Sequence, residues 1–477
     1  MCLPGQQFPN GYCTAPCGAT GVACNGTCVE SGKFGEICMK PCAKDTDCRA
    51  GEGYTCDPQW HACSLPNFAA IVPKTCKGTG AHDDAFAPAR EEIIGTAPGL
   101  YQFEPAATVL PDGSLVAMYI TRGSIFEGNA LGVSAGAKHD QPFKTDKQSH
   151  FDPWVARDRT GTVHAVWYGF DGRDQNGEIA HATTKDGVTW SKPVVVHDQA
   201  DCKDPEGACL DKPMIAIGPD PKARAKDIAY VMYSADDAGL RVRPMRGDLL
   251  GASVTALEGI YGNAVVGSDG RLHIVALDGG PMGAYGSADQ KVEYTVSADA
   301  GVSFAKPITV SAPGEILPFF FSNPSIAVDD ARRWIYVAYT RGGRNGAWDI
   351  VIAASKDGGK TWKRQTIGDG CAIHMVPNLA LDARTGTLHV AYYDSEGAPR
   401  FAHATCTPGA AKCTVKGAIN TAPFAALSTE RHGSKWIGEY ESLVIDDKRR
   451  VLHAVWTQPI TVDDKAISRV FHATAKL

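Results

Sequence analysis

The sequence predicts an all-β protein built from seven similar antiparallel sheets. Short runs of alternating or β-branched apolar residues, separated by turns, recur throughout residues 100–477. A short apolar strand, usually preceded by a polar residue and proline, starts at seven points: Glu104, Asp152, Lys212, Gly262, Asn323, Val376 and Tyr440. The starts lie roughly 50–60 residues apart, a spacing typical of propeller blades. The pattern therefore predicts a seven-bladed β-propeller of four-stranded blades.

Three of the repeats contain a related turn, at residues 184–190, 297–304 and 355–362. Each combines Ser or Thr, Asp and Gly with an aromatic residue, and these polar side chains can bond backbone groups inside the turn. The turns resemble the Asp-box (BNR) hairpins of sialidase-like β-propellers, and the resemblance covers most of residues 100–477. It implies a structural role for the box residues, which are Asp186, Trp190, Asp299, Phe304, Asp357 and Trp362.

The ring is expected to close through the amino-terminal side of the chain. The last repeat reaches only its third strand before Leu477, and the segment 91–95 (EEIIG) has the composition of a missing fourth strand. Closure of this kind removes the unpaired sheet edges that promote aggregation. The propeller is thus predicted to span residues 91–477.

Residues 1–76 are predicted to form a separate disulfide module, followed by a polar linker at 77–90. Eleven of the sixteen cysteines lie in the first 76 residues, a density typical of small secreted domains. Zinc is the alternative, since several of these cysteines form close pairs, but the histidines that accompany zinc-finger cysteines are missing nearby. The segment around 41–63 resembles small disulfide-rich repeats of secreted bacterial proteins, which serve as spacers or docking units.

The remaining cysteines suggest two local bridges, Cys202 with Cys209 and Cys406 with Cys413. Cys371 then either joins the amino-terminal module to the propeller or stays free. In the second case Cys2 resembles the lipidated first residue of a bacterial lipoprotein.

The composition of the chain indicates the cellular location of the protein and the classes of partner that it can bind. A net charge of -6 without a basic patch argues against nucleic acid, and no apolar run reaches the ~20 residues that span a bilayer. The cysteines indicate an exported protein, which is extracellular, periplasmic or at the cell surface, and Cys2 offers the one expected route to a membrane. The expected partner is a glycan or polysaccharide, with a docking partner for the amino-terminal module.

The candidate site is the mouth of the central channel. In a propeller, the loops that enter first strands and those that follow second strands share one face, where ligands bind. Candidate catalytic residues on this face are His150, His374, Tyr440, Glu104, Asp152 and Glu439. Candidate substrate-binding residues are Arg122, Arg341, Asp211, Lys212, Trp436 and Asn323. His150 and His374 share one register before their prolines and are also candidate ligands for calcium or zinc.

Three functions fit this face. The first is a polysaccharide-active enzyme. A hydrolase would pair Glu104 or Asp152 with Glu439 or Glu441. A lyase would use His150 or His374 with Tyr440, and Arg122 or Arg341 on a uronate. The segment at 150–153, followed by its strand, resembles seven-bladed BNR-repeat lyases.

The second function is a non-catalytic glycan- or protein-binding propeller, and the third is a metal-dependent enzyme. The resemblance does not extend to sialidase activity, because the arginine triad and the Arg-Ile-Pro motif of sialidases have no counterpart here.

Overall fold

The computed structural model describes most of the chain. Outside the description lie residues 1, 4–11, 15–26, 32–34, 53, 58–60, 65–85, 87–90, 97–100, 123–128, 144, 172–174, 200–208, 236–238, 279–289, 316, 319–322, 343–346, 369–371, 426 and 428–435. Cys202 and Cys371 fall in these ranges, as does the linker apart from Phe86. Among the described residues no helix is long and apolar enough to cross a membrane.

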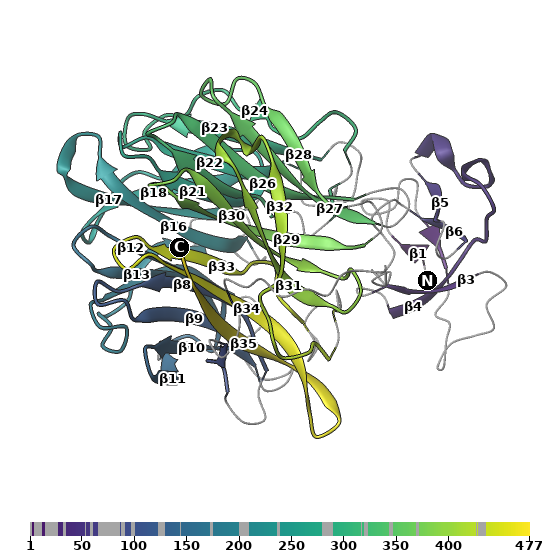
Figure 1. Ribbon diagram of the computed structural model, residues 1–477, viewed down its shortest axis with the longest axis horizontal. Helices are drawn as coiled ribbons and strands as arrows, with labels where there is room; N and C mark the ends of the chain where they lie inside the picture. The colour runs from purple at the N-terminus through teal and green to yellow at the C-terminus, as the bar shows by residue number, and fades with distance from the viewer. Residues whose placement is uncertain are drawn as a thin grey trace.

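The first 64 residues contain short two-stranded sheets (purple in Figure 1). Their strands are β1 (Cys2–Leu3), β2 (Tyr12–Cys13), β3 (Thr27–Ser31), β4 (Gly35–Met39), β5 (Thr55–Asp57) and β6 (Ala62–Ser64). Two 3-10 turns, Asp45–Asp47 and Ala50–Glu52, lie between β4 and β5. Whether the module ends at residue 76 stays a prediction.

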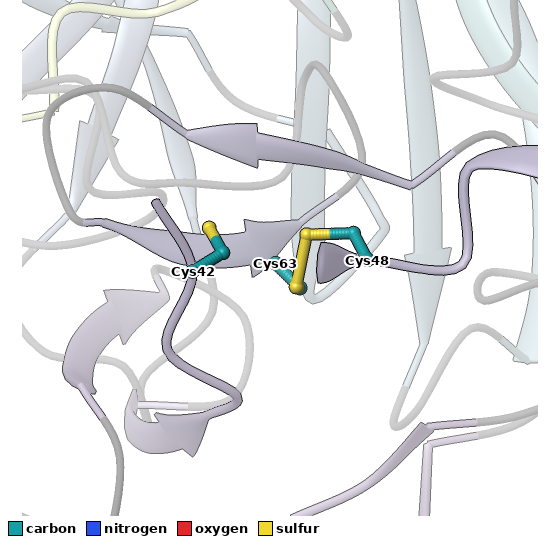
Figure 2. Close-up of side chains that lie close together, drawn as sticks. All are labelled: Cys42, Cys48 and Cys63. Atoms are coloured by element: carbon teal, nitrogen blue, oxygen red, sulfur yellow. A yellow bond between two sulfur atoms is a disulfide. The ribbon is translucent and has the colours of Figure 1, made fainter. Parts of the chain in front are cut away.

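Disulfides hold this module together, as the cysteine density predicted. Cys42 bonds Cys56 and Cys48 bonds Cys63. Figure 2 shows the sulfur of Cys42 close to the Cys48–Cys63 bridge. Because all three sulfurs are oxidised, they provide no thiolates for zinc. These bridges fit a protein that folds in an oxidising, extracytoplasmic environment.

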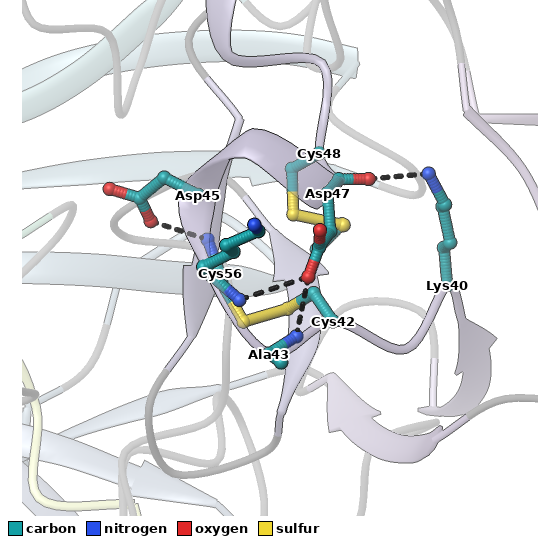
Figure 3. The surroundings of a disulfide bond; sticks show 9 residues. Lys40, Cys42, Ala43, Asp45, Asp47, Cys48 and Cys56 are labelled. Carbon is teal, nitrogen blue, oxygen red and sulfur yellow. Dashed lines mark hydrogen bonds between the residues drawn. A yellow bond between two sulfur atoms is a disulfide. The ribbon is translucent and has the colours of Figure 1, made fainter.

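A hydrogen-bonded turn supports the bridges (Figure 3). The Asp47 carboxylate accepts from the backbone N–H groups of Ala43 and Lys44, at 2.9 and 3.1 Å. The Asp45 carboxylate accepts from the N–H of Cys56 at 2.9 Å, which ties the turn to β5. Short acidic side chains thus order this turn beside the two bridges.

Seven antiparallel sheets form the propeller, as predicted. Blade one consists of β8 (Tyr101–Val109), β9 (Leu115–Arg122), β10 (Ala130–Ala135) and β11 (Lys138–Phe143). Blade two consists of β12 (Ser149–Arg157), β13 (Val163–Asp171), β14 (Gln175–Thr184) and β15 (Val194–Asp198). Blade three consists of β16 (Leu210–Asp220), β17 (Ala223–Ala235) and β18 (Leu240–Arg246), with an outer edge divided into β19 (Leu249–Leu250) and β20 (Val254–Leu257).

The remaining blades follow the same plan (green to yellow in Figure 1). Blade four consists of β21 (Ile260–Val266), β22 (Leu272–Asp278), β23 (Lys291–Ser297) and β24 (Ile308–Thr309). Blade five consists of β25 (Ser325–Asp329), β26 (Trp334–Gly342), β27 (Trp348–Ser355) and β28 (Lys363–Ile367). Blade six consists of β29 (His374–Asp382), β30 (Thr387–Asp394), β31 (Arg400–Cys406) and β32 (Cys413–Ala418). Blade seven consists of β33 (Ser442–Asp446), β34 (Val451–Val462), β35 (Lys465–Lys476) and β7 (Glu92–Ile93).

The first strands form the inner ring. Each contacts the first strands of the two neighbouring blades, and β33 contacts β8 to complete the circle. The core lies between blades, where apolar faces pack together, as Tyr336 of blade five does with Tyr392 of blade six. The predicted bridge between Cys406 and Cys413 is present in blade six, and Cys209 is disulfide-bonded.

The Asp boxes have the predicted structural role. In the box of blade five, Ser355 Oγ bonds Asp357 Oδ1 at 2.8 Å and accepts the N–H of Gly359 at 2.9 Å. Gly359 has a φ of 89°, and a Cβ there would lie 2.4 Å from the ring of Tyr294 in blade four. The box aromatic Trp362 contacts the same tyrosine, with ring centroids 5.6 Å apart. Each box therefore orders its own turn and packs it on the preceding blade.

The other two boxes repeat this arrangement. Asp299 binds Ser297 and Ser303, and Asp186 binds Thr184 and the backbone at Thr189. Their aromatic residues, Phe304 and Trp190, pack against buried clusters between blades.

The amino-terminal strand closes the ring, as the EEIIG segment predicted. Ile93 pairs with Phe471 and Glu92 with His472 in the antiparallel register. The N–H groups of Ile94 and Gly95 both donate to the Val470 carbonyl, and Ile94 is 1% exposed in a cluster with Tyr119 and Val470.

Pairs of histidines link second and third strands in three blades. His164 bonds His181 at 2.9 Å, and at 3.1 Å the same Nδ1 to Nε2 contact joins His389 with His403 and His453 with His472. Burial, with repulsion from the partner ring, lowers the pKa of His181 to about 3 and that of His453 to about 4. These rings are therefore neutral in the folded protein well below pH 6.5.

Replacing Ile94 by Ala should lower the free energy of unfolding by about 2–5 kcal/mol, because it removes buried apolar volume at the point of closure. Urea unfolding followed by tryptophan fluorescence measures the change. Val302→Ala, at a residue 59% exposed, is the matched control and should change stability by less than about 0.5 kcal/mol. Equal effects of the two substitutions would contradict a stabilising role for the closing strand.

The free energy of unfolding should fall as the pH drops from about 6.5 towards 4. In this range the unfolded chain binds protons at His181 and His453 while the folded chain does not, so acid favours unfolding. His181→Gln keeps an acceptor for His164 but cannot titrate, so it should reduce this slope. Denaturant unfolding at pH 7 and 4.5 tests it, with exposed His61→Gln as control. A slope unchanged by His181→Gln would refute the assignment.

Candidate functional site

Irregularities in the inner strands aim charged side chains into the channel. Glu104, Asp152 and Lys212 each stand directly before a proline, in the left-handed conformation, with φ values of 56°, 52° and 48°. At each point the register of the first strand shifts against the second, as in a β-bulge. Tyr261 and Val376 adopt the same conformation in blades four and six. Each such residue costs on the order of 1–3 kcal/mol, a strain that clusters at functional sites.

The bulges bring one lysine into contact with several carboxylates. Lys212 Nζ lies 2.5 Å from Asp152 Oδ1, 2.8 Å from Glu439 Oε2 and 3.9 Å from Glu104 Oε1. Glu104 and Asp211 both lie close enough to Asp152 for its carboxylate to raise their pKa values. We call these five residues the acid cluster; Asp211 is half-buried and the other four are buried. Three successive blades and the segment before β33 supply it.

Burial raises the pKa values of two carboxyl groups of the acid cluster, Glu104 and Asp211. Burial raises the pKa of Glu104 well above its usual range, and repulsion from Asp152 and Glu439 adds to this although Lys212 opposes it. Burial and the neighbouring Asp152 raise the pKa of Asp211 to about 8. Asp211 is therefore protonated near neutral pH, and burial favours the protonated form of Glu104.

Lys212 remains charged. Burial alone would lower the pKa of its ammonium, but Asp152, Glu104 and Glu439 together raise it well above the usual value. The ammonium also lies over the rings of Tyr440 and Tyr261, 5.3 and 5.8 Å from the ring centroids. Two aromatic faces and several carboxylates thus compensate one buried cation.

Tyr440 lies at the edge of the acid cluster. Its hydroxyl donates to the Pro153 carbonyl oxygen at 3.0 Å. Burial and the nearby carboxylates of Glu104 and Asp152 raise the pKa of this phenol well above its usual range. Tyr440 therefore stays protonated, acts as a hydrogen-bond donor and is a weak acid.

A pocket opens beside the acid cluster, with walls from the first strands of several blades. Its described lining includes Asp152, Lys212 and Glu439 together with Trp154, Tyr261 and Tyr440. Three asparagines, Asn263, Asn323 and Asn378, line it as well. Trp154 and Asn378 were not singled out from the sequence, although each directly follows a proline of the repeated strand start.

The two candidate histidines do not converge. His150 Nδ1 donates to the Asn129 carbonyl at 3.0 Å, and His374 Nδ1 donates to the Trp348 carbonyl at 2.9 Å. In each case the acceptor belongs to the preceding blade. The position that both histidines occupy before their prolines therefore makes the same hydrogen bond to the preceding blade. Neither ring lines the pocket of the acid cluster.

A second group of potential metal ligands surrounds His374. Nitrogen and oxygen atoms of His374, Asp394 and Glu396 lie within 4.8 Å of one another. However, Arg400 already binds Asp394 at 2.6 Å and approaches Glu396 at 3.7 Å. Its guanidinium supplies the positive charge that a cation would bring, so this group fits an ion-pair network better than a calcium or zinc site.

The remaining sequence candidates lie apart from the pocket. Arg341 pairs with Asp349 at 2.9 Å and with Glu315 at 3.6 Å. Arg122 lies over the ring of Phe151, and its Nε and Nη1 find no acceptor among the described residues. Trp436 is fully buried in an apolar cluster. Glu441 is also fully buried, where it binds the Tyr393 hydroxyl and the Thr457 N–H.

Replacing Lys212 by Met should lower the free energy of unfolding by about 3–5 kcal/mol at pH 7, because Asp152 and Glu439 lose their buried counter-ion. The loss should shrink at pH 5, where the orphaned carboxyl groups take up protons more readily. Thermal unfolding at both pH values measures it, with the exposed Lys185→Met as control. A neutral effect of Lys212→Met would mean that the acid cluster is hydrated and not a buried ion network.

Comparisons with known proteins find distant structural similarity and no match in sequence. No protein-family model matches the sequence, and no curated protein matches it. A protein of unknown function from Dyadobacter fermentans is 12% identical, with a TM-score of 0.49 over 82% of this chain and 99% of that one. An α-L-arabinanase from Penicillium chrysogenum, solved with arabinobiose, is 11% identical, with a TM-score of 0.47 over 82% of this chain and 98% of its own. Trypanosoma rangeli sialidase is 12% identical, with a TM-score of 0.41 over 79% and 60%. The sialidase-like propeller fold is established by the seven sheets and the Asp boxes of this chain, and these similarities assign it no activity.

Proposed function

We propose that this chain is an exported, carbohydrate-directed glycoside hydrolase whose site is the acid cluster. The observation that carries the proposal is the strained placement of Glu104, Asp152 and Lys212 on three successive blades, where they meet Glu439. The same left-handed bulge recurs at Tyr261 and Val376, so what distinguishes these three positions is the buried charge that they carry, and buried carboxylates are costly. Strain and buried charge together mark a functional site.

Glycoside hydrolysis requires one carboxylic acid and one carboxylate on opposite sides of the scissile bond. Glu104, whose burial raises its pKa and favours the protonated form, is the proposed general acid. Glu439 or Asp152, both held by Lys212, is the proposed nucleophile or base. The separation between the acid and the nucleophile or base decides whether the configuration is retained or inverted.

Elimination is less well supported by the same geometry. A lyase needs a free base and a cation on the uronate carboxylate. His150 and His374 bond backbone carbonyls of neighbouring blades, and the Tyr440 hydroxyl donates to a carbonyl. Arg341 is already paired with Asp349 and Glu315.

One observation favours the alternative, a non-catalytic glycan-binding propeller. Lys212 lies between Asp152 and Glu439, in the space that a scissile bond would need. In this second function the pocket would bind sugar while the acid cluster remained a fixed ion network.

The disulfide module suits a protein outside the cytoplasm, in the periplasm, at the cell surface or in the medium. As part of the proposal, residues 1–76 act as a spacer or docking unit for the propeller at 91–477. A lipid on Cys2 is the proposed route to a membrane, and mass spectrometry of the exported protein would detect it.

Glu439→Gln and Glu104→Gln should each lower kcat/KM by at least ~100-fold, because each removes an acid or a nucleophile without changing the volume of the side chain. Reducing ends released from neutral and acidic polysaccharides give the rate, and proton NMR of the first product gives its configuration. Exposed Glu258→Gln is the control and should leave the rate unchanged. Full activity in both cluster variants, with unchanged melting temperatures, would place catalysis elsewhere.

A further inference from the structure

The pocket beside the acid cluster offers no free positive charge. Among its described lining residues, Lys212 is the single cation, and Asp152 and Glu439 already hold its ammonium at 2.5 and 2.8 Å. Arg122 and Arg341, the arginines expected to bind a substrate carboxylate, are not among these lining residues.

The charge balance of the site is negative. Asp152, Glu439, Glu104 and Asp211 surround one ammonium, so even with two of the four protonated the lysine balances only one of the other two, and one negative charge remains. A ligand carboxylate would approach these oxygens in a buried setting where like charges repel strongly. Since Lys212 is already bound, nothing in the described lining would offset this repulsion.

Neutral hydrogen-bonding groups provide the remaining polarity of the pocket. The Nδ2 of Asn323 donates to the Glu439 carbonyl oxygen at 3.1 Å, which fixes the orientation of the amide. Its Oδ1 is buried and has no hydrogen-bond partner among the described residues. A buried acceptor without a partner is costly, and a sugar hydroxyl is a donor that would satisfy it.

Aromatic side chains supply a surface for the apolar face of a sugar ring. Trp154 and Tyr440 lie with ring centroids 5.3 Å apart, and Tyr261 lines the pocket from blade four. Ligand pockets combine such apolar walls with a few fixed polar groups, as is the case here.

We infer that the pocket takes an uncharged sugar unit, with a hydroxyl donating to Asn323 Oδ1 and its C–H face on the aromatic wall, and that it rejects uronates and sialic acids. This inference deepens the proposed function and rests on it for the location of the site. It does not depend on whether the sugar is cleaved.

Matched ligands that differ in one carboxylate test the inference. Oligogalactosides against oligogalacturonides, and lactose against sialyllactose, are titrated into the full chain by calorimetry and assayed in parallel for released reducing ends. The neutral member of a pair should bind at least 10-fold more tightly. Asn323→Ala should weaken that binding at least 10-fold, whereas the exposed Asn176→Ala should not.

The outcomes separate this inference from the proposed hydrolysis. Neutral sugars that bind without cleavage would support the inference and refute the hydrolase. Preferential binding or cleavage of the acidic member would overturn the inference, and cleavage would leave the hydrolase standing. Absence of binding by either member, or unchanged affinity in Asn323→Ala, would also overturn it.

Discussion

The pairing of β7 with β35 is the contact on which the whole ring depends. A blade at an open end would expose a row of backbone donors and acceptors, as well as the apolar face that normally packs on its neighbour. Two paired residues, with Ile94 buried behind them, remove that edge. Because the inner strands contact one another all the way round, closure also fixes the distances across the channel.

The site is a product of that geometry. Glu104, Asp152 and Lys212 are far apart in the sequence, and each is directed inwards by a bulge of its own blade. The unfavourable backbone conformations persist because the surrounding sheets hold them. The Lys212 ammonium in turn offsets the cost of burying several carboxylates together. Removing it would leave buried charges without a counter-ion, which is strongly destabilising.

Much of the fold could be predicted from the sequence because its signals are local. Strand alternation, the repeated starts and the box turns need only neighbouring residues, and the EEIIG segment was recognisable as the missing strand. For the acid cluster, the sequence predicts only that its residues lie on one face of the propeller. It does not predict their contacts, because the sequence of a single repeat contains no information on distances between blades. The acceptors of His150 and His374 belong to the preceding blades, and Arg341 pairs with Glu315 in the connection between blades four and five. A repeated register can mark a repeated structural bond as readily as a site, and the histidines illustrate this.

The position of β7 also determines the order in which the chain can fold. Glu92 and Ile93 leave the ribosome or the export channel early, whereas their partners Phe471 and His472 arrive only after the other blades have emerged. Pairings of such large sequence separation are slow, and incomplete blades expose edges in the meantime. A disulfide module that folds by itself at the leading end would be finished long before the ring is. Closure of the propeller is therefore expected late in folding, when the last hairpin pairs with a strand synthesised near the start of the chain.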